Sequence, residues 1–179
     1  SDGTQIWGQE DIKIAGHGTV QAGVIAFSDN SGDRKWDPRE YILYIPEGFE
    51  GKELPILMLY PGNSQTDSIF MDSTLWWQLA EKEGIALAFV CETYSSSPSS
   101  VSHADSDKFY QSLVTLMEEK IDGSYADLDF NRIYGSGQSA GSAATQGFAV
   151  TNPEFFAAVG STSAAAAEKE NSAFATIPT

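Results

Sequence analysis

The chain has 179 residues, of which 41% are hydrophobic and 20% charged, and this composition is ordinary for one globular domain with a sizeable core. Its formal net charge of −15 argues against a nucleic-acid partner and against docking on an anionic membrane, because phosphate groups would be repelled. No apolar run reaches the ~18 residues of a membrane-spanning helix, and the presence of a single cysteine, Cys91, excludes an internal disulfide.

The N-terminal part of the sequence predicts antiparallel strands. Residues 11–29, DIKIAGHGTVQAGVIAFSD, alternate loosely between apolar and polar positions and are broken by glycine, which is typical of short strands at the edge of a sheet. Residues 39–49, REYILYIPEGF, predict a further strand that ends at Pro46 and Gly48.

Two continuous apolar runs follow, residues 54–62 and 85–94, and both are typical of central strands that are covered on their two faces. Between them, residues 71–84 predict a helix that Asp72 or Ser73 caps and that ends at Gly84. The residues on one face of this helix would be Leu75, Trp76, Leu79 and Ala80.

The second half of the chain continues the same alternation. After a polar loop, residues 106–121 predict a helix with apolar residues at helical spacing, namely Phe109, Leu113, Met117 and Ile121. Residues 131–137 predict a third strand, residues 139–150 a helix rich in small residues and residues 155–165 a fourth strand. The order of edge strands followed by β-α-β-α-β-α-β implies one α/β domain over residues 1–179, with a mainly parallel sheet and helices on both faces.

A G-x-S-x-G pattern lies where the third of these strands meets its helix, at Gly137, Ser139 and Gly141 in YGSGQSAGSAA. A serine nucleophile must protrude from a sharp strand-to-helix turn, and glycines two positions before and after it relieve the crowding there. The backbone N–H of Ala140, at the start of the helix, would be free to bind an oxyanion. The alternative is a glycine-rich packing turn in which Ser139 only caps the helix.

A second N–H donor is expected from the loop that follows the first apolar run, LYPGNSQTDS. Gly62 would let the backbone approach the site, and the N–H of Asn63 is the best candidate donor. The alternative here is a plain Pro-Gly turn.

The segments EYILYIPEGFEGKELPILMLYPGNSQTDS and NRIYGSGQSAGSAA, with NPEFFAAVGSTSA after them, resemble the esterase and polyhydroxybutyrate-depolymerase branch of the α/β-hydrolases, which also holds feruloyl and acetylxylan esterases. The resemblance runs from about Arg39 to Ala165. It implies a Ser-His-Asp carboxylesterase with Ser139 as nucleophile, and with Asn63 and Ala140 as backbone oxyanion donors. Two positions depart from the pattern: Pro61 stands where the family has histidine, and Ser142 where it has glycine.

The catalytic histidine and acid are not evident in this sequence. In the α/β-hydrolases the acid and the histidine follow the serine, but His17 and His103 both precede Ser139. We interpret His17 as a turn histidine and His103 as an exposed loop histidine. The resemblance also implies two more strands after the last one found here, so we expect the C-terminal strands, the histidine and the acid to come from a C-terminal segment or from a second polypeptide.

The sequence therefore predicts a serine esterase that acts on a small or polymeric ester and needs no cofactor. A serine peptidase on the same fold and a non-catalytic binding module are the alternatives. Residues 29–37, DNSGDRKWD, resemble the start of a calcium loop, but the glycine is misplaced and no glutamate closes the loop, so we predict no metal site. The chain opens on SDGTQ without an initiating methionine, which suits a mature or trimmed protein. We expect a secreted or periplasmic location in preference to a cytoplasmic one.

Overall fold

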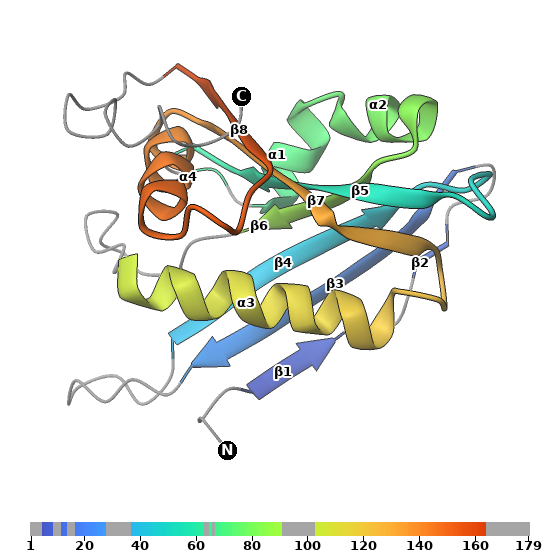
Figure 1. Ribbon diagram of the computed structural model, residues 1–179, viewed down its shortest axis with the longest axis horizontal. Helices are drawn as coiled ribbons and strands as arrows, with labels where there is room; N and C mark the ends of the chain where they lie inside the picture. The colour runs from blue at the N-terminus through green and yellow to red at the C-terminus, as the bar shows by residue number, and fades with distance from the viewer. Residues whose placement is uncertain are drawn as a thin grey trace.

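The computed structural model describes residues 5–8, 12–13, 17–27, 37–62, 65, 67–90 and 103–163. These residues form a twisted sheet with helices on both of its faces (Figure 1). The strands are β1 (Gln5–Gly8), β2 (Ile12–Lys13), β3 (Thr19–Phe27), β4 (Asp37–Ile45), β5 (Glu53–Tyr60), β6 (Ala86–Val90), β7 (Asp127–Gln138) and β8 (Ala158–Thr162). The helices are α1 (Asp67–Ser73), α2 (Trp76–Glu83), α3 (His103–Lys120) and α4 (Ala140–Thr151).

The strand order confirms the predicted mixture of pairings. The sheet runs β1-β3-β4-β6-β5-β7-β8, with β2 paired to β3 outside this path. Strands β1 to β4 pair antiparallel, as does β4 with β6, whereas β6, β5, β7 and β8 are parallel to one another. Because β5, β6, β7 and β8 run in the same direction, their carboxyl ends lie at one edge of the sheet, where ligands bind in open α/β folds.

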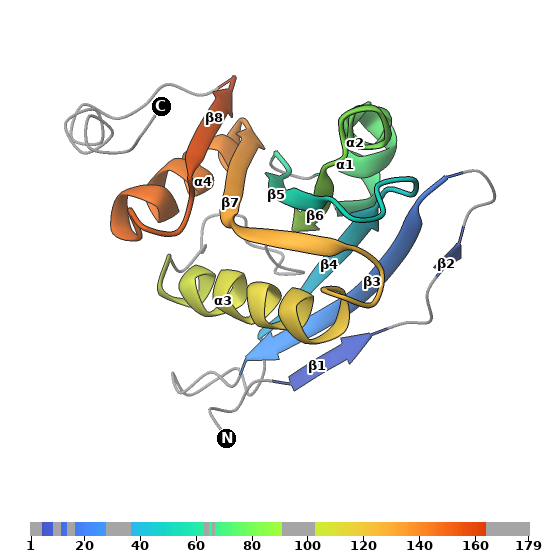
Figure 2. The same cartoon turned by 45° about the vertical axis from the view of Figure 1, so that its right-hand side comes forward.

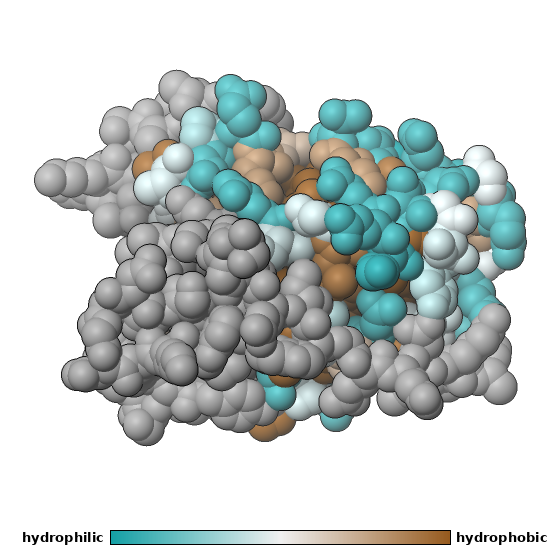
Figure 3. Space-filling model, turned by 90° about the horizontal axis from the view of Figure 1, so that it is seen from below, coloured by the Kyte–Doolittle hydropathy of each residue, from teal (hydrophilic) through white to brown (hydrophobic). Residues whose placement is uncertain are grey.

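Helices α3 and α4 cover one face of the sheet, and α1 and α2 cover the other, as the two views show (Figures 1 and 2). The four apolar residues predicted for the inner face of α3 are all buried in the core beneath it: Phe109, Leu113, Met117 and Ile121. The smaller core on the opposite face joins α1 and α2 to the sheet through Phe70, Ala80, Leu87 and Phe89. Seen from below, apolar residues also reach the surface near the centre of the molecule, with hydrophilic residues around them (Figure 3).

The helix predicted over residues 71–84 is in fact two short helices. The predicted N-caps, Asp72 and Ser73, are wrong because both lie within α1: the N-cap of α2 is Leu75, without a side-chain hydrogen bond, and Leu75 is 67% exposed. The hydroxyl of Ser73 instead donates to the carbonyl of Phe70 at 3.4 Å, within the last turn of α1. Gly84 ends α2 as predicted, with φ 73° and its N–H bound to the carbonyl of Ala80.

Two other boundaries differ from the prediction. Helix α3 begins at His103, three residues before the predicted start, so His103 is the first residue of a helix and not a loop residue. Strand β7 begins at Asp127 and shifts its register against β5 between Pro55 and Ile56. This irregularity lies away from the carboxyl end of β7, where the pairing with β5 is regular. Within the described residues, no helix is long and apolar enough to cross a membrane.

Candidate active site

Ser139 lies at the turn between the end of β7 and the start of α4. Its backbone has φ 54° and ψ −117°, a conformation that costs a residue other than glycine about 1–3 kcal/mol. Ser139 is exposed, and although it holds the N-cap position of α4, its side chain makes no capping hydrogen bond. The turn therefore presents the hydroxyl outward at the carboxyl edge of the parallel strands.

The two predicted elbow glycines fill positions that exclude any side chain. A β-carbon on Gly137 would lie 2.3 Å from the carbonyl oxygen of Gly141, and one on Gly141 would lie 2.3 Å from the carbonyl oxygen of Pro61. Both neighbours are backbone atoms, which cannot move aside as the end of a side chain can. Strand β7, helix α4 and the loop after β5 are thus packed in direct backbone contact at the turn.

The loop after β5 lies beside Ser139. A β-carbon on Gly62 would be 3.6 Å from the β-carbon of Ser139. Gln65 closes this loop: its side-chain oxygen accepts the N–H of Gly62 at 2.9 Å, and its own N–H binds the carbonyl of Gly62 at 3.1 Å. Sequence reasoning missed Gln65, because a glutamine side chain carries no signal of the backbone group that it binds.

Of the two predicted oxyanion donors, the structure describes Ala140 alone. Ala140 is exposed and is the first residue of α4, where backbone N–H groups have no partner within the helix. Its N–H adjoins Ser139 in the chain and belongs to the positive end of the helix dipole. Asn63 lies outside the described residues.

The end of β8 is joined to the same turn by hydrogen bonds that sequence reasoning did not find. The N–H of Ser139 donates to the carbonyl of Thr162 at 3.0 Å, and the Thr162 hydroxyl donates to the carbonyl of Gly137 at 2.8 Å. The side chain of Gln146, on α4, donates to the hydroxyl of Ser161 at 2.5 Å. These bonds connect residues that are 15 to 25 positions apart, so no local pattern could reveal them.

His17 lies far from the turn, at the opposite edge of the sheet, just before β3. Its Nδ1 is 2.9 Å from a carboxylate oxygen of Glu81, and its ring meets Trp77 edge to face. Burial raises the pKa of Glu81, but hydrogen bonds from Tyr44 and His17 outweigh this and hold the pKa below its usual value. The interpretation of His17 as a satisfied turn histidine agrees with these contacts.

Burial raises the pKa of Tyr44 in this cluster to about 12, and its hydrogen bond to Glu81 adds to the effect. Tyr44 also accepts the N–H of Gly18 at 3.1 Å. Tyr44, Glu81 and His17 thus connect the chain before β3 to helix α2, which is a structural role.

His103 begins α3, which starts near the carboxyl edge of the parallel strands. Its backbone is described, whereas the position of its side chain falls outside the described part of the structure. The single cysteine, Cys91, and the acidic segment 29–36 also lie outside that part.

A buried carboxyl group follows the loop that contains Gly62. Asp67, the first residue of α1, is 3% exposed, and burial raises its pKa to about 6. The N–H of Ser68 donates to it at 2.8 Å and opposes the rise, while the nearby carboxylate of Glu40 adds to it. The pattern of apolar and polar residues did not indicate this burial, because an aspartate at the start of a helix is ordinarily an exposed residue.

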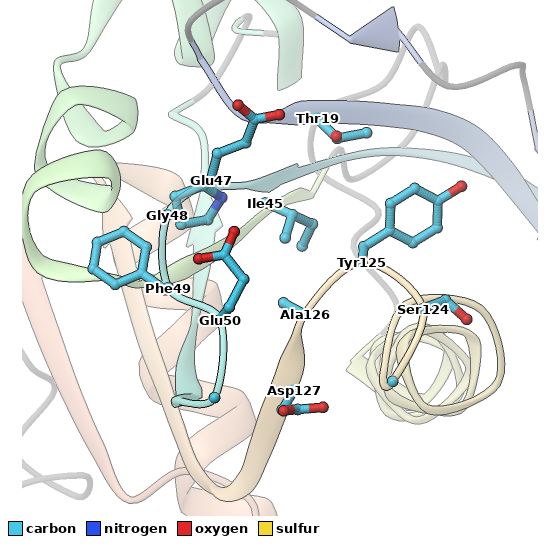
Figure 4. A pocket seen from close by; sticks show the side chains of 13 residues that line it. Thr19, Ile45, Glu47, Gly48, Phe49, Glu50, Ser124, Tyr125, Ala126 and Asp127 are labelled. Atoms are coloured by element: carbon cyan, nitrogen blue, oxygen red, sulfur yellow. The ribbon is translucent and has the colours of Figure 1, made fainter.

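A cavity of about 750 Å³ lies at the amino ends of the parallel strands, between the turn after β4 and the turn before β7. Ile45, Phe49 and Tyr125 line it, and the carboxylates of Glu47 and Glu50 lie at its border (Figure 4). Ser139 is at the other end of β7, so this cavity is separate from the turn. Among the described side chains, no three histidine, cysteine, aspartate or glutamate residues gather as a metal site would require.

Comparison with known proteins points to one family. The family model described as "Esterase PHB depolymerase" matches residues 39–178. A search of the curated proteins found no match for this sequence.

Solved structures share the fold at low sequence identity. An S-formylglutathione hydrolase from Agrobacterium tumefaciens is 14% identical with a TM-score of 0.60, and the match covers 85% of this chain and 60% of that one. An acetyl xylan esterase from Aspergillus awamori is 19% identical with a TM-score of 0.54, covering 79% and 53%. A ferulic acid esterase from the anaerobic fungus Anaeromyces mucronatus is 14% identical with a TM-score of 0.55, covering 84% and 61%.

These likenesses confirm the predicted α/β-hydrolase fold for the matched part. The chain spans between 53% and 61% of the length of these three structures. Among the described residues, β8 is the last strand of the sheet on its side and pairs only with β7.

Proposed function

Because the chain belongs to the esterase PHB depolymerase family, we propose that it is the Ser139-bearing part of a serine carboxylesterase. The observation that carries this proposal is the backbone of Ser139, which is held at φ 54° and ψ −117° between two glycines in backbone contact. A strained conformation persists only where the surroundings fix it, and such positions gather at active sites. A capping serine would need no such strain.

The proposed reaction proceeds through an acyl-enzyme. The Oγ of Ser139 attacks the ester carbonyl carbon while a histidine takes its proton, and the N–H groups of Ala140 and Asn63 bind the oxyanion that forms. The intermediate collapses, the carbon–oxygen bond to the alcohol breaks, and the histidine returns the proton to the departing alkoxide. Water then attacks the acyl-enzyme by the same route and releases the acid and free Ser139.

We propose that the histidine and the acid come from a C-terminal segment of the same precursor or from a second polypeptide. Three observations support this: His17 is bound to Glu81 at the opposite edge of the sheet, the outer side of β8 has no described strand neighbour, and the solved relatives are longer. Denaturing mass spectrometry of the active natural protein tests the idea. A chain longer than these 179 residues, or two co-purifying chains, is expected. A single active species near 19.3 kDa would contradict it.

The substrate class that we propose is a carboxylic ester, either small or on a polymer. Similarity to the structures of an acetyl xylan esterase and a ferulic acid esterase supports esters of this kind. The exposed position of Ser139 at the carboxyl edge of the sheet is compatible with a bulky substrate.

Replacement of Ser139 tests the proposed function in the natural full-length protein. Ser139→Ala should lower kcat for a p-nitrophenyl ester by a factor on the order of 10⁶, as loss of a triad nucleophile does. Ser124→Ala, at an exposed turn at the other end of β7, is the matched control and should retain full activity. A fluorophosphonate should label the wild-type protein at Ser139 and leave the Ser139→Ala variant unlabelled. A protein that is neither labelled nor active would favour the non-catalytic binding module.

A further inference from the structure

The backbone of Ser139 has a strained conformation, so contacts from other residues must hold it in place. The two elbow glycines permit the close packing of β7 and α4, but a glycine makes no directional contact that would fix a neighbouring residue. Hydrogen bonds to the turn from outside β7 and α4 supply that direction. Among the described residues, the bonds that reach the turn from β8 come from Thr162.

Thr162 holds the turn at two points. Its carbonyl accepts the N–H of Ser139, which extends the parallel pairing in which Gln138 faces Thr162. Its hydroxyl donates to the carbonyl of Gly137, two residues before Ser139. A single residue of β8 therefore binds the backbone on both sides of Gln138. The hydroxyl bond is not part of the sheet ladder, since it comes from a side chain.

The strand end that carries Thr162 is itself fixed from α4. Gln146 is 3% exposed, and its side-chain nitrogen donates to the hydroxyl of Ser161 at 2.5 Å and approaches that of Ser142 at 3.5 Å. Ser142, one of the two residues that depart from the family pattern, is fully buried in this group. Gln146 thus joins the helix that begins beside Ser139 to the strand end that holds Ser139.

We propose that Thr162 is a positioning residue for Ser139, and that Gln146 supports it. The inference rests on the proposed function. The hydroxyl of Thr162 fixes the carbonyl of Gly137 and so sets the direction from which the chain enters the turn. That direction decides where the Oγ of Ser139 and the N–H of Ala140 lie relative to the ester carbonyl.

The test compares three threonine variants in the natural full-length protein. Thr162→Val removes the hydroxyl at almost unchanged shape, and Thr162→Ser keeps it. Thr151→Val is the matched control, because the Thr151 hydroxyl also binds backbone carbonyls, those of Gly147 and Phe148, but at the far end of α4. The readouts are the rate of labelling by a fluorophosphonate, kcat and KM for a p-nitrophenyl ester, and the thermal unfolding midpoint.

Thr162→Val should lower the labelling rate and kcat about tenfold, because a small misplacement of a reacting atom is costly, with little change in KM. Thr162→Ser should keep most of the wild-type labelling rate and most of the wild-type kcat. Thr151→Val should lose no activity while its midpoint falls about as much as that of Thr162→Val. Equal rates for Thr162→Val and the wild type, or no recovery in Thr162→Ser, would overturn the inference. An active Ser139→Ala variant would instead overturn the proposed function, which separates the two failures.

Discussion

The backbone of Gly141 lies so close to Gly137 that a methyl group on Gly137 would be 2.3 Å from the carbonyl oxygen of Gly141. Because the obstructing atoms belong to the backbone, Gly137→Ala must push α4 away from β7. We expect it to lower the free energy of unfolding by about 3 kcal/mol or more, in the range of severe overpacking. Urea denaturation followed by circular dichroism measures this loss.

Gly160 provides the control for that substitution. A β-carbon at this exposed position of β8 would be 3.8 Å from its nearest neighbour, the hydroxyl of Ser136. Gly160→Ala should therefore change the free energy of unfolding by less than about 1 kcal/mol. A Gly137→Ala variant as stable as Gly160→Ala would contradict the packing described for the turn.

Replacement of Ser139 by glycine and by alanine should give variants of different stability that have both lost activity. Glycine adopts φ 54° and ψ −117° without strain, whereas alanine keeps the strain of serine. We expect Ser139→Gly to be more stable than Ser139→Ala by about 1 kcal/mol, with both variants inactive on esters. The thermal unfolding midpoints of the two purified variants measure this difference in stability. A less stable glycine variant would show that the backbone at this position is not strained.

The sequence allowed the turn at Ser139 to be located because all of its signals are local. Gly137 and Gly141 lie within two residues of Ser139, directly between an apolar strand and a helix of small residues. The contacts of Thr162 and Gln65 could not be predicted, since a threonine hydroxyl or a glutamine amide shows nothing of its partner in the sequence. The division of residues 71–84 into two helices was missed because the apolar spacing of Leu75, Trp76 and Leu79 looks like part of one continuous helix, whereas the structure leaves Leu75 67% exposed between α1 and α2.

Asp67 should make the protein less stable as the pH rises through the mildly acidic range. Its pKa is about 6 in the folded protein against an ordinary value of 3.8, so the folded state binds the proton more tightly. The contribution to stability is full below about pH 4 and is lost as the pH passes 6, by up to about 3 kcal/mol. The free energy of unfolding of the wild type minus that of Asp67→Asn should fall accordingly between pH 4 and pH 7.

The exposed Asp72, at the other end of α1, gives the comparison for that measurement. Asp72→Asn makes the same change from carboxyl to amide at an exposed position, and it is measured over the same pH range. If the Asp67→Asn difference did not fall relative to the Asp72→Asn difference, the raised pKa of Asp67 would be wrong. Urea denaturation at several pH values gives the free energy of unfolding of each variant and of the wild type, and so both differences as a function of pH.

His17 and His103 should both be dispensable for hydrolysis. The Nδ1 of His17 is engaged by Glu81 at the edge of the sheet opposite Ser139, so its ring cannot reach the serine hydroxyl. We expect His17→Ala to cost about 0.5 kcal/mol of stability, as exposed ion pairs do, and to leave kcat/KM within about tenfold of the wild type. The kcat/KM of His103→Ala should likewise stay within about tenfold of the wild type, because we propose that the general base lies outside this chain.

The double variant of His17 and His103, assayed on a p-nitrophenyl ester beside Ser139→Ala, gives the clearest test. Retained activity would require a base from another segment, whereas a collapse to the level of Ser139→Ala would place the base within these 179 residues and overturn the proposed division of the active site.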